Sequence, residues 1–111
     1  MNVECKIVDR NLIVIMLGEL DHHNAKVVRE KIDKLIERNN IQNIIFDFGH
    51  MDFMDSSGIG VIMGRYKNLN SIGGSVGVTN VKPSVDRIFN LSGLYKIISK
   101  YESINDALKV I

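Results

Sequence analysis

The run Ile44-Ile45-Phe46-Asp47-Phe48 decides the fold class, because it is short, almost wholly apolar and bounded by polar residues. A strand with this pattern is covered on both faces, as in a parallel sheet. Met51 to Met54 follow it and lead into Asp55-Ser56-Ser57-Gly58. The next apolar side chains recur at three- and four-residue steps, at Ile59, Ile62, Met63, Tyr66 and Leu69. The stretch therefore predicts a buried strand followed by a helix.

Toward the N-terminus, the sequence predicts a hairpin and a first helix. Val3 to Asp9 alternate apolar and polar side chains, Leu12 to Leu17 are almost wholly apolar, and Arg10-Asn11 could form the turn between them. A carboxylate suited to a helix N-terminus then stands at Asp21, and Asn39-Asn40 mark the end of that helix. Its inward side chains would be Ala25, Val28, Ile32, Leu35 and Ile36.

Toward the C-terminus, Gly73-Gly74 end the second helix and strands continue to alternate with helices. The remaining elements are a strand at Ser75 to Thr79, a helix from Pro83 to Ser92-Gly93, a short strand at Ile97-Ile98 and a helix from Asn105 to Val110. The predicted order is ββαβαβαβα. It indicates one α/β domain over residues 1–111, with a mostly parallel sheet and an N-terminal antiparallel edge strand.

Composition excludes several classes of function. The 111 residues are the usual size of one domain, and 45% apolar residues can form a core. Fourteen Lys and Arg against thirteen Asp and Glu give a charge of +1, without the basic field that nucleic-acid binding requires. No apolar run approaches the ~20 residues of a membrane-spanning helix, and the first residues do not resemble a signal peptide. We expect a soluble, cytoplasmic protein that binds neither nucleic acid nor membrane.

A hydrolytic triad is poorly supported by the serines and histidines. No glycine stands two places before Ser56 or Ser57, so the G-x-S-x-G nucleophile elbow is absent. On a helix start, the adjacent His22 and His23 would point about 100° apart. We therefore predict that the protein is not an enzyme and has no catalytic residue. A low-turnover hydrolase is a third alternative.

Metal and phosphate sites have similarly weak signals. The spacing of His22, His23 and His50 does not place two imidazoles on one helix face. The pattern G-x-G-x-x-G, begun by Gly58 and Gly60, would need a glycine where Met63 stands. The sequence predicts no metal and no cofactor.

Two hydroxyls behind a carboxylate remain distinctive, at Asp55-Ser56-Ser57. The common explanation is an ordinary helix N-cap, in which Asp55 or Ser56 accepts a backbone N–H. From local chemistry alone, capping is the better explanation.

Four segments resemble a known family in the same order along the chain. They are Gly18-Glu19-Leu20-Asp21-His22-His23, Phe53-Met54-Asp55-Ser56-Ser57-Gly58-Ile59-Gly60, Gly64-Arg65-Tyr66-Lys67 and Ser92-Gly93-Leu94-Tyr95-Lys96-Ile97-Ile98. They resemble the STAS-domain anti-sigma factor antagonists, in particular those that control sigma-F in spore-forming bacteria. The fold of that family has the element order predicted above.

The resemblance implies a switch between partners. In the family, the serine after the aspartate, here Ser56, is phosphorylated by the anti-sigma factor, which is a serine kinase. The unphosphorylated protein would bind that kinase and release the sigma factor, which would permit sporulation transcription. Phosphorylation would end the binding, and a serine phosphatase would restore it.

Loops after neighbouring parallel strands usually share one surface, which predicts a partner-binding face. Its candidate residues are Asp21, His22, His23, Asp55, Ser56, Ser57, Gly58 and Ile59. Two alternatives stay open at this stage: Ile59 could belong to the core, and Asp21 could only cap the first helix. A nucleotide- or anion-sensing STAS module is the second functional class. We expect a monomer.

Overall fold

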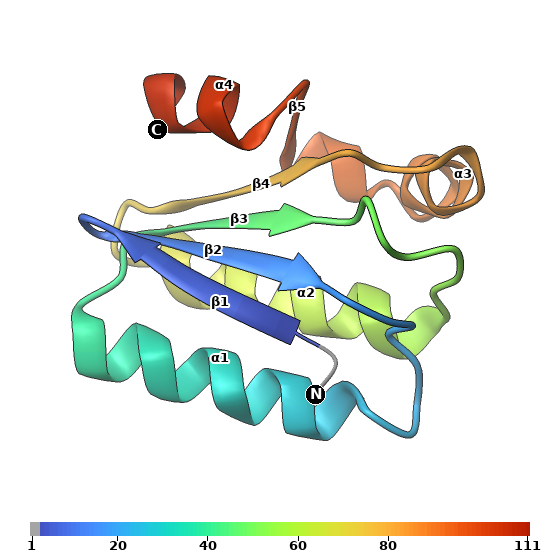
Figure 1. The fold of residues 1–111 in the computed structure, drawn as a ribbon, viewed down its shortest axis with the longest axis horizontal. Coiled ribbons are helices and arrows are strands. Elements are labelled where there is room, and N and C mark those ends of the chain that lie inside the picture. Colours follow the sequence, from blue (N-terminus) through green and yellow to red (C-terminus); the bar gives the residue numbers. More distant parts are fainter. Residues whose placement is uncertain (1–2) are drawn as a thin grey trace.

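The sheet lies between helices in the computed structural model, which describes residues 3–111 (Figure 1). Its five strands are β1 (Val3–Val8), β2 (Asn11–Met16), β3 (Asn43–Asp47), β4 (Ser75–Thr79) and β5 (Ser99–Tyr101), in the spatial order β1-β2-β3-β4-β5. β1 is antiparallel to β2, and every other neighbouring pair is parallel. The predicted α/β class, element order and antiparallel edge strand are confirmed.

The opening hairpin turns one residue earlier than predicted. Val8 pairs with Asn11, so the turn is Asp9-Arg10 instead of Arg10-Asn11. Asp9 has a φ of 57°, the left-handed conformation that two-residue hairpin turns favour and that aspartate tolerates.

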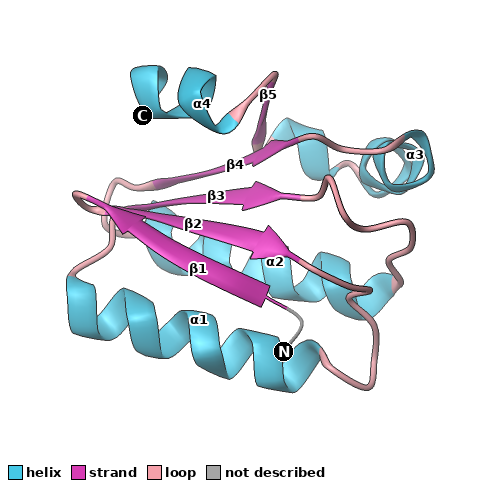
Figure 2. Cartoon of the chain, viewed as in Figure 1, coloured by secondary structure: helices cyan, strands magenta, loops and turns pink. Residues whose placement is uncertain are grey.

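Helices cover the two faces of the sheet unequally. α1 (Ala25–Asn39) and α2 (Ser56–Asn70) lie on one face, and α4 (Ile104–Val110) lies on the other (Figures 1 and 2). α3 (Pro83–Ser92) sits beyond the carboxyl ends of the parallel strands. None of the helices within residues 3–111 is long and apolar enough to cross a membrane.

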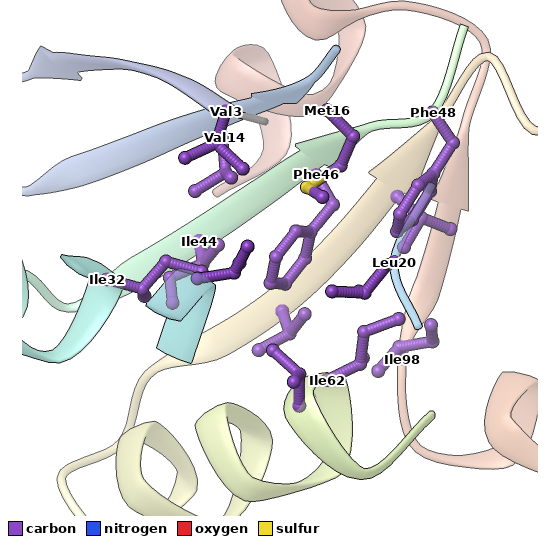
Figure 3. Packing of buried hydrophobic residues seen from close by; sticks show 14 of the residues in the cluster. Val3, Val14, Met16, Leu20, Ile32, Ile44, Phe46, Phe48, Ile62 and Ile98 are labelled. Atoms are coloured by element: carbon purple, nitrogen blue, oxygen red, sulfur yellow. The ribbon is translucent and has the colours of Figure 1, made fainter. Parts of the chain in front are cut away.

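The larger core fills the space between the sheet and the helices on the α1 and α2 side. Its members include the side chains labelled in Figure 3, namely Val3, Val14, Met16, Leu20, Ile32, Ile44, Phe46, Phe48, Ile62 and Ile98. A smaller cluster of Ile13, Ile45 and Ala107 lies on the α4 side. β3 contributes to both clusters, which explains why its three central residues, Ile44, Ile45 and Phe46, are all apolar.

The prediction of a strand at Ile97-Ile98 is wrong, because the strand lies at Ser99–Tyr101. The backbone N–H groups of Ile97 and Ile98 both donate to the carbonyl of Leu94, at 3.0 and 3.1 Å, so they close the 3-10 helix η1 (Leu94–Lys96). Ile98 is buried, and the strand follows as the polar β5. The apolar pair therefore reflects burial in the core and not sheet pairing.

Candidate functional site

The Asp55 carboxylate joins the two loops that follow β2 and β3. Oδ1 accepts the N–H of Ser57 at 2.8 Å, and Oδ2 accepts the N–H of His22 at 3.2 Å, across 33 positions of sequence. An isolated parallel bridge between Leu20 and Met54 holds the same loops together. The expected proximity of the two loops is confirmed, whereas their contact with a partner stays a prediction.

Asp55 is also the N-cap of α2, as the common explanation of its sequence position proposed. It has an extended backbone, with φ −104° and ψ −172°, and its carbonyl accepts the N–H of Gly58 at 3.0 Å. Burial pushes the pKa of the Asp55 carboxyl upward. Hydrogen bonds from the backbone N–H groups of Ser57, His22 and Gly58 and from the Ser57 hydroxyl outweigh burial, so the pKa falls below its usual range.

The two serines differ in exposure although they are adjacent. Ser56 is the first residue of α2 and is exposed. Ser57 is half-buried and donates its N–H to Asp55 Oδ1. An incoming enzyme can therefore reach the Ser56 hydroxyl more readily than that of Ser57.

Gly58 lies against the Leu20–Met54 bridge. A Cβ at this position would stand 2.4 Å from Met54 Cγ, 2.8 Å from Met54 Sδ and 3.1 Å from the Leu20 carbonyl oxygen. The glycine is buried, so close packing of α2 on the loops accounts for it. Contact of Gly58 with a partner stays a prediction.

The loop before α1 is fixed by a reciprocal pair of hydrogen bonds. Asp21 Oδ1 accepts the N–H groups of His23 and Asn24 at 3.0 and 3.2 Å, and the Asp21 N–H donates to Asn24 Oδ1 at 2.9 Å. α1 begins only at Ala25, so His22 and His23 lie in a turn and not on the helix start as predicted. Both imidazoles are exposed, with ring centroids 6.0 Å apart in an edge-on arrangement.

An open groove flanks Ser56 on the side of α3. It has a volume of about 470 Å³ and is lined by Met54, Asp55, Ser56, Ile59, Ile88, Leu91 and Ser92. Ile59 is half-buried and packs on the core while lining this groove, so the two roles proposed for it are compatible. Leu91 is 81% exposed, so the groove has an apolar wall that is open to solvent.

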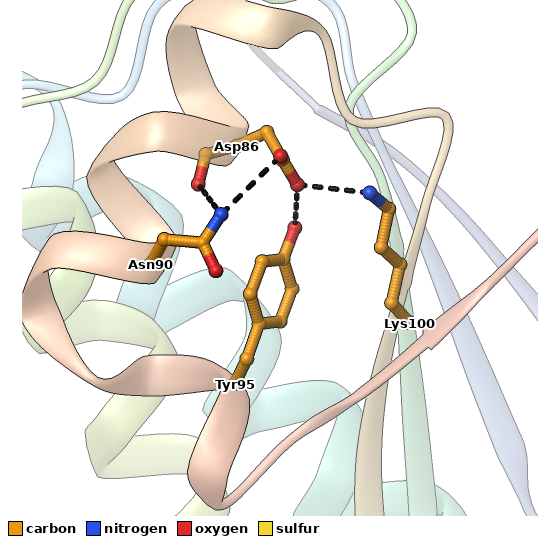
Figure 4. A network of polar contacts seen from close by, with 4 residues as sticks. All are labelled: Asp86, Asn90, Tyr95 and Lys100. Carbon is orange, nitrogen blue, oxygen red and sulfur yellow. Dashed lines mark hydrogen bonds and ion pairs between the residues drawn. The ribbon is translucent and has the colours of Figure 1, made fainter.

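A polar network holds α3 in place beside the groove (Figure 4). Asp86 Oδ1 accepts the Tyr95 hydroxyl at 2.5 Å and the Lys100 ammonium at 2.9 Å, and Asn90 Nδ2 donates to the Asp86 carbonyl at 3.1 Å. The Tyr95 hydroxyl and Lys100 are the main causes that hold the pKa of Asp86 below its ordinary range. Burial, followed by the hydrogen bond and charge of Asp86, raises the pKa of Tyr95. The network ties α3 to η1 and β5.

Within residues 3–111, no three His, Cys, Asp or Glu side chains are placed to hold a metal ion. The site instead offers capped backbone, one exposed hydroxyl, two imidazoles and an apolar groove. These groups suit protein recognition.

The family model of the STAS domain matches residues 2–107. The chain belongs to the STAS domain family. The anti-sigma F factor antagonist of Paenibacillus polymyxa is 45% identical over 97 residues, which cover 87% of this chain and 83% of that protein. The resemblance of the four sequence segments to anti-sigma factor antagonists is thereby confirmed.

Solved structures of SpoIIAA in its unphosphorylated and phosphorylated forms are also similar to this one. The unphosphorylated anti-sigma factor antagonist SpoIIAA superposes with a TM-score of 0.85 at 32% identity, over 96% of this chain and 92% of that one. The phosphorylated form of SpoIIAA from Bacillus gives a TM-score of 0.76 at 29% identity, over 96% of both chains.

Sequence reasoning missed three parts of this STAS site. The Asp21-to-Asn24 pair has the spacing of a reciprocal cap, so a local pattern could have revealed Asn24. Ile88 and Leu91 reach the groove only through the placement of α3. Lys26 and Arg29 of α1 line one hollow together with Ser57 of α2. In the sequence, the helical spacing of these two cations looks the same as that of an ordinary solvated helix face.

Proposed function

We propose that this chain is an anti-sigma factor antagonist that acts by partner switching. The unphosphorylated form binds an anti-sigma factor that is a serine kinase and releases the sigma factor for sporulation transcription. The kinase phosphorylates Ser56 and thereby ends the binding, and a serine phosphatase restores it. The protein acts without contacting DNA and without catalysing a reaction of its own.

The position of Ser56 carries the proposal. Its side chain is exposed, stands at the first residue of α2, and lies at the rim of the groove whose walls include Ile59, Ile88 and Leu91. Asp21, His22 and His23 are on the neighbouring loop, held to Asp55 by the His22 hydrogen bond. A partner docked on the groove would cover Ser56, so the state of this hydroxyl would control docking.

A phosphate on Ser56 should affect the interface more than the fold. It carries a charge of about −1.5 to −2, which at the exposed start of α2 remains hydrated and meets the positive end of the helix dipole. Similarity to SpoIIAA in both its unphosphorylated and phosphorylated forms supports a fold that tolerates the modification. Under a docked partner, the phosphate would lose water beside an apolar groove and the Asp55 carboxylate. A penalty of roughly 4 kcal/mol would weaken binding about a thousandfold.

The test compares Ser56→Asp with Ser56→Ala for binding to the anti-sigma factor by calorimetry, with thermal unfolding of the same samples. Ser56→Ala should bind constitutively, because removal of one exposed hydroxyl at a helix start costs at most ~1 kcal/mol. Ser56→Asp should lose most binding while remaining folded. Since an aspartate has less charge than a phosphate, some binding can persist.

Ser57→Ala is the matched control, because Ser57 is adjacent but half-buried and bonded to Asp55. Incubation with the kinase and ATP should place the phosphate on Ser56 in both wild type and Ser57→Ala, as mapped by mass spectrometry. Phosphate mainly on Ser57, or normal binding by Ser56→Asp, would contradict the proposed switch.

A further inference from the structure

A second hollow flanks the candidate site, between α1 and α2. It has a volume of about 450 Å³ and is lined by His22, Ala25, Lys26, Arg29, Ser57, Gly60 and Val61. A Cβ added to Gly60 would meet nothing within 4 Å, so the α2 side of the hollow is open. The hollow shares His22 with the loop face and is separated from the apolar groove by the start of α2.

The hollow is lined by two cations, Lys26 and Arg29, and of these two, within the described residues, only Lys26 has a carboxylate within 4.0 Å. Asp33 is occupied by the buried Arg65, at 3.0 Å between Oδ1 and Nε, and Lys26 has only a loose contact of 3.9 Å with Glu30. In the described part of the chain, Arg29 forms no ion pair. The lining therefore presents the guanidinium of Arg29 and the ammonium of Lys26 on one exposed side.

The backbone at this end of α2 has few groups left for an anion. The N–H of Ser57 is bonded to the Asp55 carboxylate, and those of Gly58 and Ile59 to the Asp55 carbonyl at 3.0 and 3.4 Å. A phosphate cradle needs such N–H groups to be free. Side-chain cations remain, and a planar guanidinium matches a carboxylate through two parallel hydrogen bonds. The geometry thus favours a carboxylate brought by a docked protein over a free phosphate.

We propose that the hollow receives an acidic side chain of the anti-sigma factor, with Arg29 as its main contact and Lys26 as a second cation. The inference rests on the proposed function. It assigns the partner a surface with an apolar side chain for the α3 groove and a carboxylate on the other side of the start of α2. Charge complementarity at α1 would thereby fix the orientation in which the partner covers Ser56.

The test measures affinity for the anti-sigma factor in the Ser56→Ala background, which the kinase cannot modify at that position. Arg29→Glu should weaken binding by about tenfold or more and reduce its dependence on salt. Lys34→Glu is the matched control, because it makes the same type of charge reversal on the exposed surface of α1 outside the hollow, and should change affinity less than about twofold. If Arg29→Glu unfolds the chain, the neutral Arg29→Gln replaces it, with about threefold weakening expected.

The outcomes separate this inference from the proposed function. If the Ser56→Ala parent does not bind the anti-sigma factor, the proposed function fails and the inference fails with it. If the parent binds and the folded Arg29 and Lys34 variants bind equally well, only the inference is overturned. Titration of the free protein with inorganic phosphate or ATP should leave the amide signals of Lys26 and Arg29 unshifted. Saturable shifts there would assign the hollow to a phosphate ligand and overturn the carboxylate proposal.

Discussion

Replacement of Gly58 by alanine should push the start of α2 away from the two loops of the candidate site. The new Cβ would fall 2.4 Å from Met54 Cγ and 3.1 Å from the Leu20 carbonyl oxygen, both distances shorter than ordinary contacts. Met54 is 1% exposed and Leu20 is fully buried, so neither can move into solvent. The methyl group must therefore push α2 away from the bridge between these two residues.

The expected magnitude is the difference between two opposing effects. Inserting a methyl group into a packed site costs typically ~1–3 kcal/mol, while alanine in a helix is better than glycine by up to ~1 kcal/mol. Because the 2.4 Å approach to Met54 Cγ places the packing cost in the upper part of its range, ~2–3 kcal/mol, Gly58→Ala should lower the free energy of unfolding by about 1–2 kcal/mol. For a chain of this length, that corresponds to a fall in Tm of roughly 4–10 °C.

Gly60→Ala is the control, because it lies in the same helix and its Cβ would meet nothing within 4 Å. It should stabilise the protein by about 0.5–1 kcal/mol through helix propensity alone. Urea unfolding followed by circular dichroism would give both values, and hydrogen exchange at the His22 amide would report the contact with Asp55. Equal stability of the Gly58→Ala and Gly60→Ala proteins would refute the close packing described for Gly58.

Three polar contacts elsewhere in the molecule give further expected outcomes. Because its hydrogen bonds lower the pKa of Asp86, the stability they provide is present above the unfolded pKa of ~3.9 and is lost as the pH falls through the folded value. Asp86→Asn should flatten this acid loss in urea unfolding between pH 2 and 6. The pKa of Tyr95 is shifted upward, so its contribution to stability is lost at high pH: the free energy of unfolding should fall as the pH rises above the unfolded pKa of ~10. Tyr95→Phe should remove that fall. Arg65→Met should cost about 1–3 kcal/mol in chemical denaturation, since it leaves the partly exposed Asp33 without its partner. Asp21→Asn keeps an oxygen that can accept the two N–H groups before α1, so the free energy of unfolding should change by less than ~0.5 kcal/mol. Binding to the anti-sigma factor, measured by calorimetry, should weaken by about 1–3 kcal/mol because the charge is lost. A parallel fall in stability would assign Asp21 to the fold alone.

Most of the fold could be predicted because local sequence carries the signals that determine it. The apolar run of β3 and the three- and four-residue spacing in α1 and α2 are local patterns, and each is explained by burial in the structure. β5 was misplaced because it is a three-residue polar edge strand, whose pairing with β4 depends on where η1 ends. An edge strand of this kind has neither alternation nor an apolar run to mark it.

The candidate site was less predictable, since its contacts join distant segments. Proximity of the two loops follows from parallel strands, but the bond from His22 to the Asp55 carboxylate spans 33 positions and has no local signature. The groove also needs the Asp86 network to hold α3, so nothing in the sequence around Leu91 indicates that this side chain borders a groove. The sequence shows which side chains are available for the site, whereas only the tertiary structure shows which of them lie next to one another.

The spatial order of the strands equals their order along the chain, and this has a consequence during synthesis. Each strand finds its place beside the preceding one, so no strand must be inserted later between two that are already paired. A ribosome adds roughly 5–20 residues each second, slowly enough for the β1–β2 hairpin and then the β3 ladder to form as they emerge. The loops around Asp21 and Asp55 are complete once α2 has been made, but α3 and its anchor on β5 are made later. A nascent chain would thus carry its Ser56 loop before it has a finished groove, and competence to capture a partner would arise only after β5 has been made.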